Sequence, residues 1–275
     1  MVEQQHQRQM VASHFRAVST GWGPRYEGRP RKMSDLDLQL RRENVQRLLE
    51  AAAGRTALPM RVVDLGCGAG NVLDHVSRDL VRVIGVDVVP EMVKQAALDH
   101  PGDSFLVADA SKLPVRPESV DAVTCVGVLE YLTDPLSALN TIWRGLKPGG
   151  FLIVSFPNKS SLFRTLSGWE TTAERALLQV RDRLLGRPRA DSGRPVYSHT
   201  QWSVPTAKTM LQHAGFSIES VRLQTFGLWG WVGRMRPALW LSRQLSSVLG
   251  REGVLSRRLG CTVVMLARKP SRNPT

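Results

Sequence analysis

Hydrophobic residues along this chain gather in short runs, separated by stretches in which apolar positions recur with helical spacing. The runs are rich in β-branched residues and are bounded by turn residues, as in strands buried on both faces of a parallel sheet. The expected strands cover residues 61–65, 81–86, 104–108, 119–126, 151–156, 216–224 and 261–268. Strands alternating with helices predict an α/β protein with a doubly wound, Rossmann-like sheet.

A helical segment is expected before the first strand. Ser34 and Asp37 have the spacing of a capping box and predict the start of a helix, which Gly54 would end. The apolar positions Leu38 and Val45 would face the sheet from this helix.

Three glycines follow the first expected strand, in the run Asp64-Leu65-Gly66-Cys67-Gly68-Ala69-Gly70. Glycine permits a tight turn and lets a ligand lie against the backbone at the carboxyl edge of a strand. The second strand ends in Asp87, where a carboxylate can accept hydrogen bonds from both hydroxyls of a ribose. The G-x-G-x-G spacing departs from the dinucleotide fingerprint G-x-G-x-x-G, so the pattern predicts a nucleoside-like cofactor and disfavours an oxidoreductase.

Further motifs follow in series along the chain. They are Gly85-Val86-Asp87, Pro90-Glu91-Met92, Ala108-Asp109-Ala110, Ser119-Val120-Asp121, Val128-Leu129-Glu130-Tyr131 and Leu146-Lys147-Pro148-Gly149-Gly150. In this order, together with the glycine run, they resemble the motifs of class I S-adenosylmethionine-dependent methyltransferases of the small-molecule type. The resemblance is close over residues 60–160 and returns at 199–216 and in the last strand. It implies S-adenosyl-L-methionine as the cofactor and a seven-stranded sheet whose last strand is antiparallel.

The resemblance also implies a division of the chain around one core. The expected parts are an N-terminal helical cap (1–55), the S-adenosylmethionine-binding core (56–160), a helical insertion that would form a substrate lid (161–200) and the C-terminal part of the core (201–275), which carries a basic, Trp-rich insertion (227–260).

Cofactor-binding residues are carried over from the matching motifs. Asp64 is expected to hold the ammonium group of the cofactor, directly or through water, Asp87 the ribose, and Asp109 with Ala110 the adenine. Small residues at the end of the fourth strand, Val126 among them, would leave room for the methyl group. The remaining expected contacts are Gly66, Gly68 and Gly70 of the glycine run, Val88 beside Asp87, and Tyr26 of a leading segment that would fold over the cofactor.

The catalytic residues are where the sequence departs from the family pattern. Relatives often carry Glu-His or His-His after the fourth strand, whereas this chain has Glu130-Tyr131. We interpret Glu130 as the proton acceptor or orienting group, with Tyr131 either catalytic or a packed aromatic. His199 is the rival base, because its segment resembles one that lies near the acceptor pocket in the family. Asn158 is expected at the pocket mouth, and no spacing of metal ligands is present.

Composition and charge constrain partners and location. The chain has 275 residues, 42% hydrophobic and 22% charged, which is ordinary for one globular enzyme domain. An N-terminus without an apolar run and cysteines confined to expected buried strands favour a reduced, cytoplasmic setting. The formal net charge of +13 suits an anionic partner, whether nucleic acid, phospholipid or an acidic small molecule, although genomic composition also produces arginine-rich chains.

Two segments outside the core pattern are open to two interpretations. Residues 160–196 contain an amphipathic helical pattern, and residues 227–260 combine tryptophans and arginines with an apolar stripe. The stripe comprises Ala238, Leu241, Leu245, Val248 and Leu249. Both helices would either close over the core or form a substrate lid and a surface that touches the inner face of the membrane peripherally.

The sequence thus predicts a methyltransferase acting on a small hydrophobic or amphipathic acceptor, lipid-like in one interpretation, by O-methylation in a biosynthetic pathway. An RNA methyltransferase and a non-catalytic, cofactor-binding scaffold are the alternatives. Nucleic acid is the less favoured substrate, because no base-methyltransferase motif accompanies the arginines. The oligomeric state is not readable from the sequence.

Overall fold

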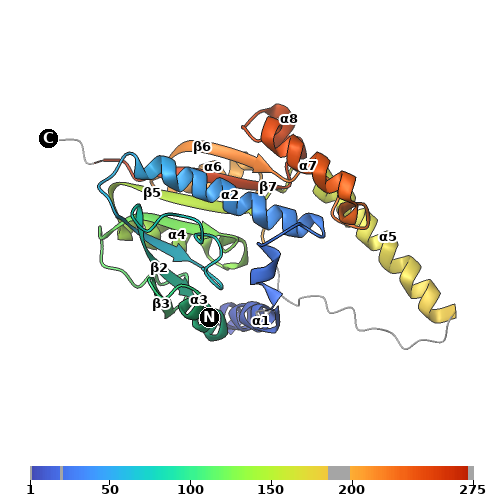
Figure 1. Cartoon of the computed structure of the whole chain (residues 1–275), viewed down its shortest axis with the longest axis horizontal. Helices are drawn as coiled ribbons and strands as arrows, with labels where there is room; N and C mark the ends of the chain where they lie inside the picture. Colours follow the sequence, from blue (N-terminus) through green and yellow to red (C-terminus); the bar gives the residue numbers. More distant parts are fainter. Residues whose placement is uncertain (1, 19–20, 185–198, 272–275) are drawn as a thin grey trace.

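A mixed sheet forms the centre of the molecule. The computed structural model describes residues 2–18, 21–184 and 199–271 (Figure 1). Within these ranges, seven strands pair in the order β3-β2-β1-β4-β5-β7-β6. The strands are β1 (Met60–Leu65), β2 (Val81–Asp87), β3 (Ser104–Val107), β4 (Val120–Val126), β5 (Leu146–Pro157), β6 (Ser217–Gln224) and β7 (Thr262–Arg268). β7 lies antiparallel between β5 and β6, and the other neighbours are parallel, so the expected fold class is confirmed.

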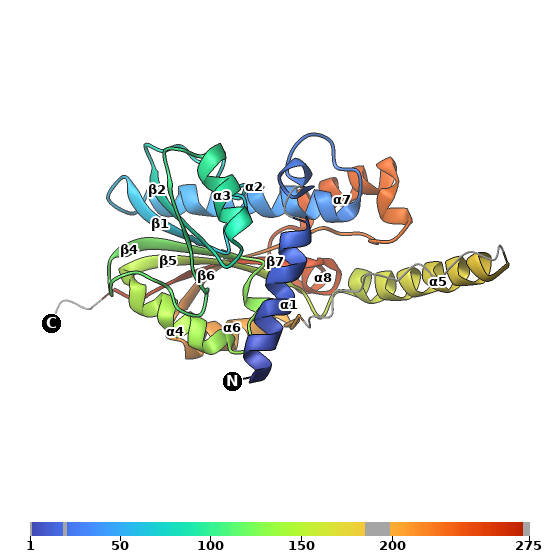
Figure 2. The same cartoon turned by 90° about the horizontal axis from the view of Figure 1, so that it is seen from below.

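Helices cover both faces of this sheet. In Figure 2, α2 and α3 lie on one side, and α4 and α6 lie on the other. The helices are α1 (Val2–Val18), α2 (Met33–Ala53), α3 (Pro90–Asp99), α4 (Pro135–Gly145), α5 (Leu162–Leu184), α6 (Val204–His213), α7 (Arg236–Leu249) and α8 (Val254–Leu259), with short 3₁₀ turns η2 (Gly23–Arg25), η3 (Leu129–Tyr131) and η4 (Val232–Arg234).

The apolar strand runs follow from this double cover. Val62 packs into the cluster under α2, with Val45 and Leu49. Its neighbour Val63 packs into the opposite cluster, with Leu139 of α4. Because successive strand residues point to opposite faces, a strand with helices on both sides must be apolar at almost every position.

The helix predicted before the first strand is present, but its predicted cap is wrong. α2 begins at Met33 with Lys32 as N-cap, and no side chain caps it. Ser34 Oγ instead accepts a hydrogen bond from Arg25 (3.1 Å), and the Asp37 carboxylate pairs with Arg41 (2.6 Å). Both side chains of the expected capping box are therefore engaged elsewhere. The predicted end at Gly54 is correct.

The two segments outside the core pattern differ in their packing. α5 projects away from the body of the molecule (Figure 1), and Leu177 on it is 72% exposed. Residues 185–198 of the first segment lie outside the described residues. The expected stripe on α7 is only partly correct: Leu245 and Leu249 pack against the core, whereas Leu241 and Val248 are exposed. Leu239, not expected on the stripe, is buried instead.

The cysteines agree with the expectation from the sequence. Cys67, Cys125 and Cys261 are free and buried, as small hydrophobic residues would be. Across the described part of the chain, no helix has both the length and the apolar character that a bilayer crossing requires.

Candidate active site

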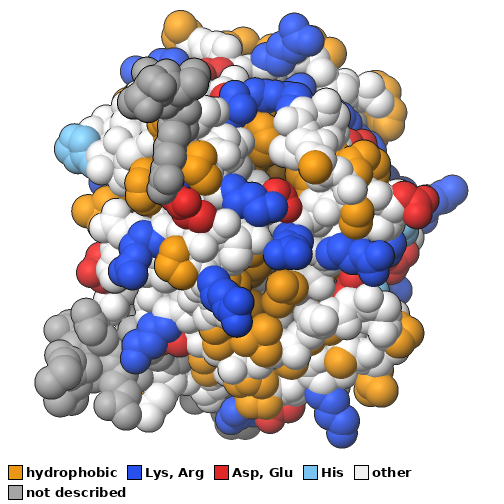
Figure 3. Space-filling model, turned by 90° about the vertical axis from the view of Figure 1, so that its left-hand side faces the viewer, with side chains coloured by type: hydrophobic (Ala, Val, Ile, Leu, Met, Phe, Trp, Pro, Cys, Tyr) orange, Lys and Arg blue, Asp and Glu red, His pale blue; other side chains and the backbone are white. Residues whose placement is uncertain are grey.

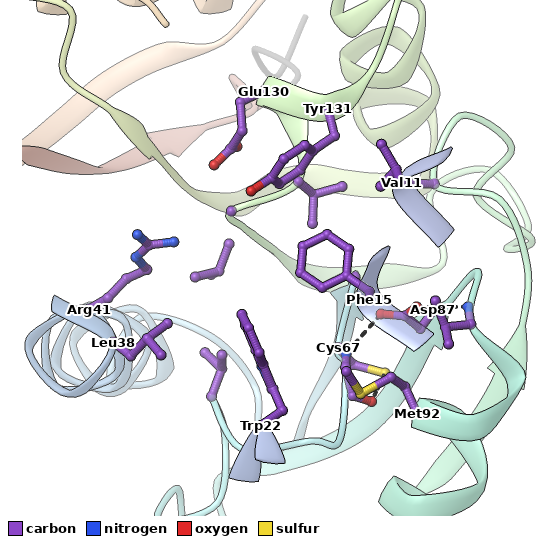
Figure 4. A pocket seen from close by; sticks show the side chains of 18 of the residues that line it. Val11, Phe15, Trp22, Leu38, Arg41, Cys67, Asp87, Met92, Glu130 and Tyr131 are labelled. Atoms are coloured by element: carbon purple, nitrogen blue, oxygen red, sulfur yellow. Dashed lines mark hydrogen bonds between the residues drawn. The ribbon is translucent and has the colours of Figure 1, made fainter. Parts of the chain in front are cut away.

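A cavity of about 320 Å³ opens where the carboxyl ends of β1, β2 and β4 meet α1 and α2. Figure 4 shows its two ends: Asp87 and Met92 lie on one side, and Arg41 and Glu130 lie on the other. In open parallel sheets this edge is the usual ligand site, because the loops after the strands separate there. The first of these ends is called the cofactor end below, and the second the acceptor end.

The glycine loop and Asp87 build the cofactor end. Gly66 and Gly68 line the cavity with φ angles of +75° and +53°, a left-handed conformation that favours glycine. The Asp87 carboxylate accepts hydrogen bonds from the backbone N–H groups of Gly68 and Val89, each 2.9 Å long. Burial nevertheless raises the pKa of Asp87. The carboxylate therefore fixes the loop and remains at the cavity wall.

Most of the other expected cofactor contacts also line the cavity. They are Val88, Asp109, Ala110, Val126 and Tyr26. Asp109 Oδ1 accepts from both the backbone N–H and the hydroxyl of Ser111, at 2.8 Å each, so this acid also closes its own turn. Tyr26 is 5% exposed, and burial raises its pKa to about 12.

Asp64 and Gly70 are not among the residues that line the cavity. Asp64 is buried behind the loop, where it accepts a 2.6 Å hydrogen bond from the Thr124 hydroxyl and where burial raises its pKa to about 7. Gly70 has a φ of +86°, and a Cβ there would overlap the His100 ring. Both residues support the loop from the side away from the cavity. Asp64 is therefore not placed to contact the ammonium group of the cofactor directly.

A cluster of three aromatic rings lies between the two ends of the cavity. The Phe15 ring on α1 meets Trp22 and Tyr131 edge to face, with centroids 5.6 and 5.5 Å apart (Figure 4). Aromatic faces attract cations such as a sulfonium, and these rings also exclude water. The leading segment therefore folds over the cavity.

Glu130 is the central group of the acceptor end. It is 3% exposed, and its Oε2 is buried without a hydrogen-bond partner. Burial raises its pKa to about 7, although the nearby Arg41 acts in the opposite direction. A carboxyl group titrating near neutral pH, with an oxygen left unpaired, has the properties of a general base.

Arg41 reaches this end of the cavity from α2. Its Nη2 pairs with Asp37 at 2.6 Å. A Cβ on Gly127, whose φ is +69°, would lie 2.7 Å from Arg41 Nη1. Glycine at this position therefore lets the guanidinium approach the end of β4 closely.

His199 and Tyr131 lie near the rim. Both line the cavity, and their ring centroids are 6.3 Å apart. His199 is exposed, with the Gln201 amide 3.3 Å from its Nε2, and partial burial together with Arg164 lowers its pKa. Over the described residues, no cluster of three or more His, Cys, Asp or Glu side chains is arranged to hold a metal ion.

The expectation for Asn158 is wrong. Its side chain is buried, and its amide donates 2.8 Å hydrogen bonds to the carbonyls of Arg257 and Gly260. It fastens the end of β5 to α8 instead of standing at the pocket mouth, because these carbonyls at the end of α8 need a buried donor.

The cavity residues missed from the sequence include three large polar or aromatic side chains of the acceptor end, Arg41, Arg164 and Trp229. Arg41 forms an i, i+4 pair with Asp37, a pattern that looks the same on an exposed helix face. Arg164 and Trp229 come from α5 and from the loop after β6, two segments that only the fold brings together. The Asp37–Arg41 spacing was the single available signal.

Comparison with known proteins agrees with this geometry. Residues 63–154 match the family model for a methyltransferase domain. A ubiquinone biosynthesis O-methyltransferase of Xanthomonas campestris is 39% identical over 119 residues, which cover 41% of this chain and 49% of that protein. One of the same name from Xylella fastidiosa is 35% identical over 106 residues, covering 36% and 43% of the two chains. The chain thus matches about half the length of these relatives.

Solved structures share the fold over a longer span. Magnesium protoporphyrin IX methyltransferase of Synechocystis PCC 6803, with bound SAH (S-adenosylhomocysteine), superposes with a TM-score of 0.59 at 16% identity, covering 96% of this chain and 99% of that one. An S-adenosylmethionine-dependent methyltransferase of Thermotoga maritima gives 0.51 at 20% identity, covering 84% and 91%. Residues 63–154 thus match a methyltransferase domain, and the sheet that contains them has the fold of these solved S-adenosylmethionine-dependent methyltransferases.

Proposed function

We propose that this protein transfers the methyl group of S-adenosylmethionine to an oxygen of a small amphipathic acceptor. One observation supports this most directly: a single cavity joins the glycine loop and Asp87 to the buried, unpaired carboxyl oxygen of Glu130. The relatives named as O-methyltransferases in ubiquinone biosynthesis support oxygen as the acceptor atom and a biosynthetic role.

The cofactor end fits an adenosyl group with an amino-acid tail. Gly66 and Gly68 leave backbone exposed for close approach, and Asp87 offers acceptor oxygens for two ribose hydroxyls. Met92 and Ala110 supply apolar surface for the adenine, with Asp109 at its edge. The bound cofactor supplies an activated methyl group, so the protein has to hold the acceptor in line and remove a proton.

Glu130 is the proposed proton acceptor. Its unpaired Oε2 is available for a hydroxyl proton, and its raised pKa matches it to proton transfer near neutral pH. Tyr131 and His199, also proposed as catalytic, stand at the rim, where they would orient the acceptor. The aromatic rings of Phe15 and Trp22 would keep water away from the reacting atoms.

Calorimetry tests the cofactor assignment directly. Binding of S-adenosylmethionine and S-adenosylhomocysteine, with NAD bound at least about a hundredfold more weakly, is the expected result. Comparable affinity for NAD would contradict the proposal. A panel of phenolic and carboxylic acceptors then tests turnover, and cofactor binding without transfer to any of them would favour the scaffold alternative.

We also infer that the surface around α5 and α7 meets an anionic membrane and receives a lipid-like acceptor there. The exposed apolar residues of this surface include Leu162, Leu166, Trp169, Trp231, Trp240, Leu241 and Val248. The Trp169 side chain is 71% exposed. Arginines flank them, and Glu252 is the one acid in residues 227–260. Trp and Arg around an apolar face are typical of interfacial helices. On the side remote from α5, basic side chains are instead scattered among acidic and apolar ones (Figure 3).

Vesicle sedimentation tests this surface. More protein should pellet with anionic than with neutral vesicles at low salt, and salt should weaken the binding. Replacing Trp231 and Trp240 with serine should abolish pelleting, whereas the same change at the exposed Leu98 of α3 should not. Equal, negligible pelleting with both vesicle types would contradict membrane contact. Salt-dependent binding to RNA in place of vesicles would favour the RNA alternative.

A further inference from the structure

Three arginines of the described residues line the cavity, and they differ in their partners. Arg25 Nε pairs with Asp35 at 3.0 Å, and Arg41 Nη2 pairs with Asp37 at 2.6 Å. Arg164 has no acidic side chain within ion-pair distance among residues 2–18, 21–184 and 199–271. Within the described part of the chain, it is therefore the cavity arginine that has no carboxylate partner.

The position of Arg164 is fixed by its surroundings. The guanidinium carbon lies 5.3 Å from the centre of the Trp229 ring. The Trp229 backbone N–H donates a 2.8 Å hydrogen bond to Ser167 Oγ, one turn further along α5, so the loop after β6 is tied to this helix. A stacked guanidinium keeps its planar edge of donors available, because the ring covers only its face.

The guanidinium also has an unmet need for hydrogen bonds. Arg164 Nε is buried and has no partner among the described residues. A half-buried cation without a partner is unfavourable, because desolvation is not offset by an opposite charge. Glu130, which Arg164 influences electrostatically, does not come within ion-pair distance of it in the described structure, and burial keeps that carboxyl largely protonated below neutral pH.

We propose, on the basis of the proposed methyl transfer, that Arg164 binds an anionic oxygen group of the acceptor, a carboxylate or a phosphate. The fork of guanidinium N–H donors matches two such oxygens, and its Nε would find there the partner it lacks. The acceptor would then be an amphipathic acid: its apolar part lies along the aromatic rings of Phe15 and Tyr131, and its hydroxyl faces Glu130. The acidic group sets orientation and specificity.

Matched aromatic probes test this assignment without knowledge of the natural acceptor. Binding of 2-naphthoate, 2-naphthyl phosphate and the uncharged 2-naphthamide is measured by NMR titration with S-adenosylhomocysteine present. At least one anionic probe should bind about tenfold or more tightly than the amide, the effect expected of a charge-assisted pair. The two anionic probes distinguish a carboxylate from a phosphate.

Variants then show whether Arg164 causes the preference. Arg164→Gln should abolish it, Arg164→Lys should keep part of it, and Arg183→Gln, the same change near the other end of α5, should retain it in full. Equal affinity of acid and amide for the unmodified protein, or a preference that survives in Arg164→Gln, would overturn the proposal. The affinity for S-adenosylhomocysteine, measured on the same samples, should be the same in the variants and in the unmodified protein. If the unmodified protein does not bind S-adenosylhomocysteine at all, the proposed function is refuted instead.

Discussion

The two ends of the cavity are built on different principles. The cofactor end is formed mainly by backbone N–H groups and strand ends. Asp87 accepts hydrogen bonds from two backbone N–H groups, in the loops that follow two adjacent strands. At the acceptor end, side chains from α2, η3, α5 and the loop after β6 converge, and their polar atoms are incompletely paired. One end is thus satisfied before a ligand arrives, whereas the other leaves Glu130 and Arg164 with unmet hydrogen bonds.

This difference indicates where specificity resides. A backbone cradle suits a cofactor that is the same in every turnover, because its geometry does not depend on a few side-chain rotamers. Unpaired side chains in a partly closed site discriminate among acceptors, since a ligand that leaves them unpaired binds poorly. Changes at the two ends should therefore separate into effects on turnover and effects on cofactor affinity.

The largest expected effect is on turnover, from Glu130→Gln. If the carboxylate is the general base, the amide should lower turnover by roughly 10²–10⁴ while S-adenosylhomocysteine affinity stays unchanged. Steady-state kinetics on an acceptor from the panel, with calorimetry on the same variant, measures both. Near-normal turnover would show that the acceptor end works by positioning alone.

The pH dependence of stability provides the next test. Burial raises the pKa of Glu130 from 4.5 to about 7, so the folded state binds more protons than the unfolded state between these values. The free energy of unfolding should then fall as pH rises from about 4.5 to 7, by about 3 kcal/mol from this group. Burial also raises the pKa of Asp64, behind the cofactor end, to about 7. This group therefore lowers the free energy of unfolding with rising pH in the same way.

Denaturant unfolding of variants at several pH values separates the two acids. Glu130→Gln and Asp64→Asn should each flatten the pH dependence of stability. Only Glu130→Gln should also remove a rise in turnover with pH near 7, because Glu130 lines the cavity and Asp64 does not. A pH dependence of unfolding unchanged in both variants would contradict the raised pKa values.

A smaller effect is expected at the cofactor end, from Asp87→Ala. Loss of hydrogen bonds to a charged group should weaken S-adenosylhomocysteine binding by about 1.5–3 kcal/mol, or roughly 10- to 150-fold. Asp87→Asn keeps one carbonyl acceptor for the loop and should lose less affinity, while Glu50→Ala, an exposed acid on α2, should lose none. Unchanged affinity in Asp87→Ala, measured by calorimetry, would remove Asp87 from the ribose site.

The same contrast explains what could be predicted from the sequence. Strand ends, the glycine loop and Asp87 are encoded by contiguous motifs whose geometry is local, so sheet and cofactor end could be placed by residue number. Arg164 and Trp229 lie 65 positions apart, and only tertiary packing sets one against the other. The capping box at Ser34 and the position of Asn158 were mispredicted for a related reason. Ser34 accepts a hydrogen bond from Arg25, and Asn158 donates to a carbonyl of α8, and neither partner can be inferred from the local sequence.

The smallest effect is expected from His199→Ala. His199 lines the cavity but is exposed, its ring centroid lies 6.3 Å from Tyr131, and partial burial together with proximity to Arg164 lowers its pKa. An imidazole with a lowered pKa at the rim can orient the acceptor but is a weaker base, so turnover should fall by less than about tenfold, with the loss mainly in KM. A fall of a hundredfold or more in kcat, together with a mild effect of Glu130→Gln, would transfer the role of base to His199 and place the chemistry at the rim instead of the buried end of the cavity.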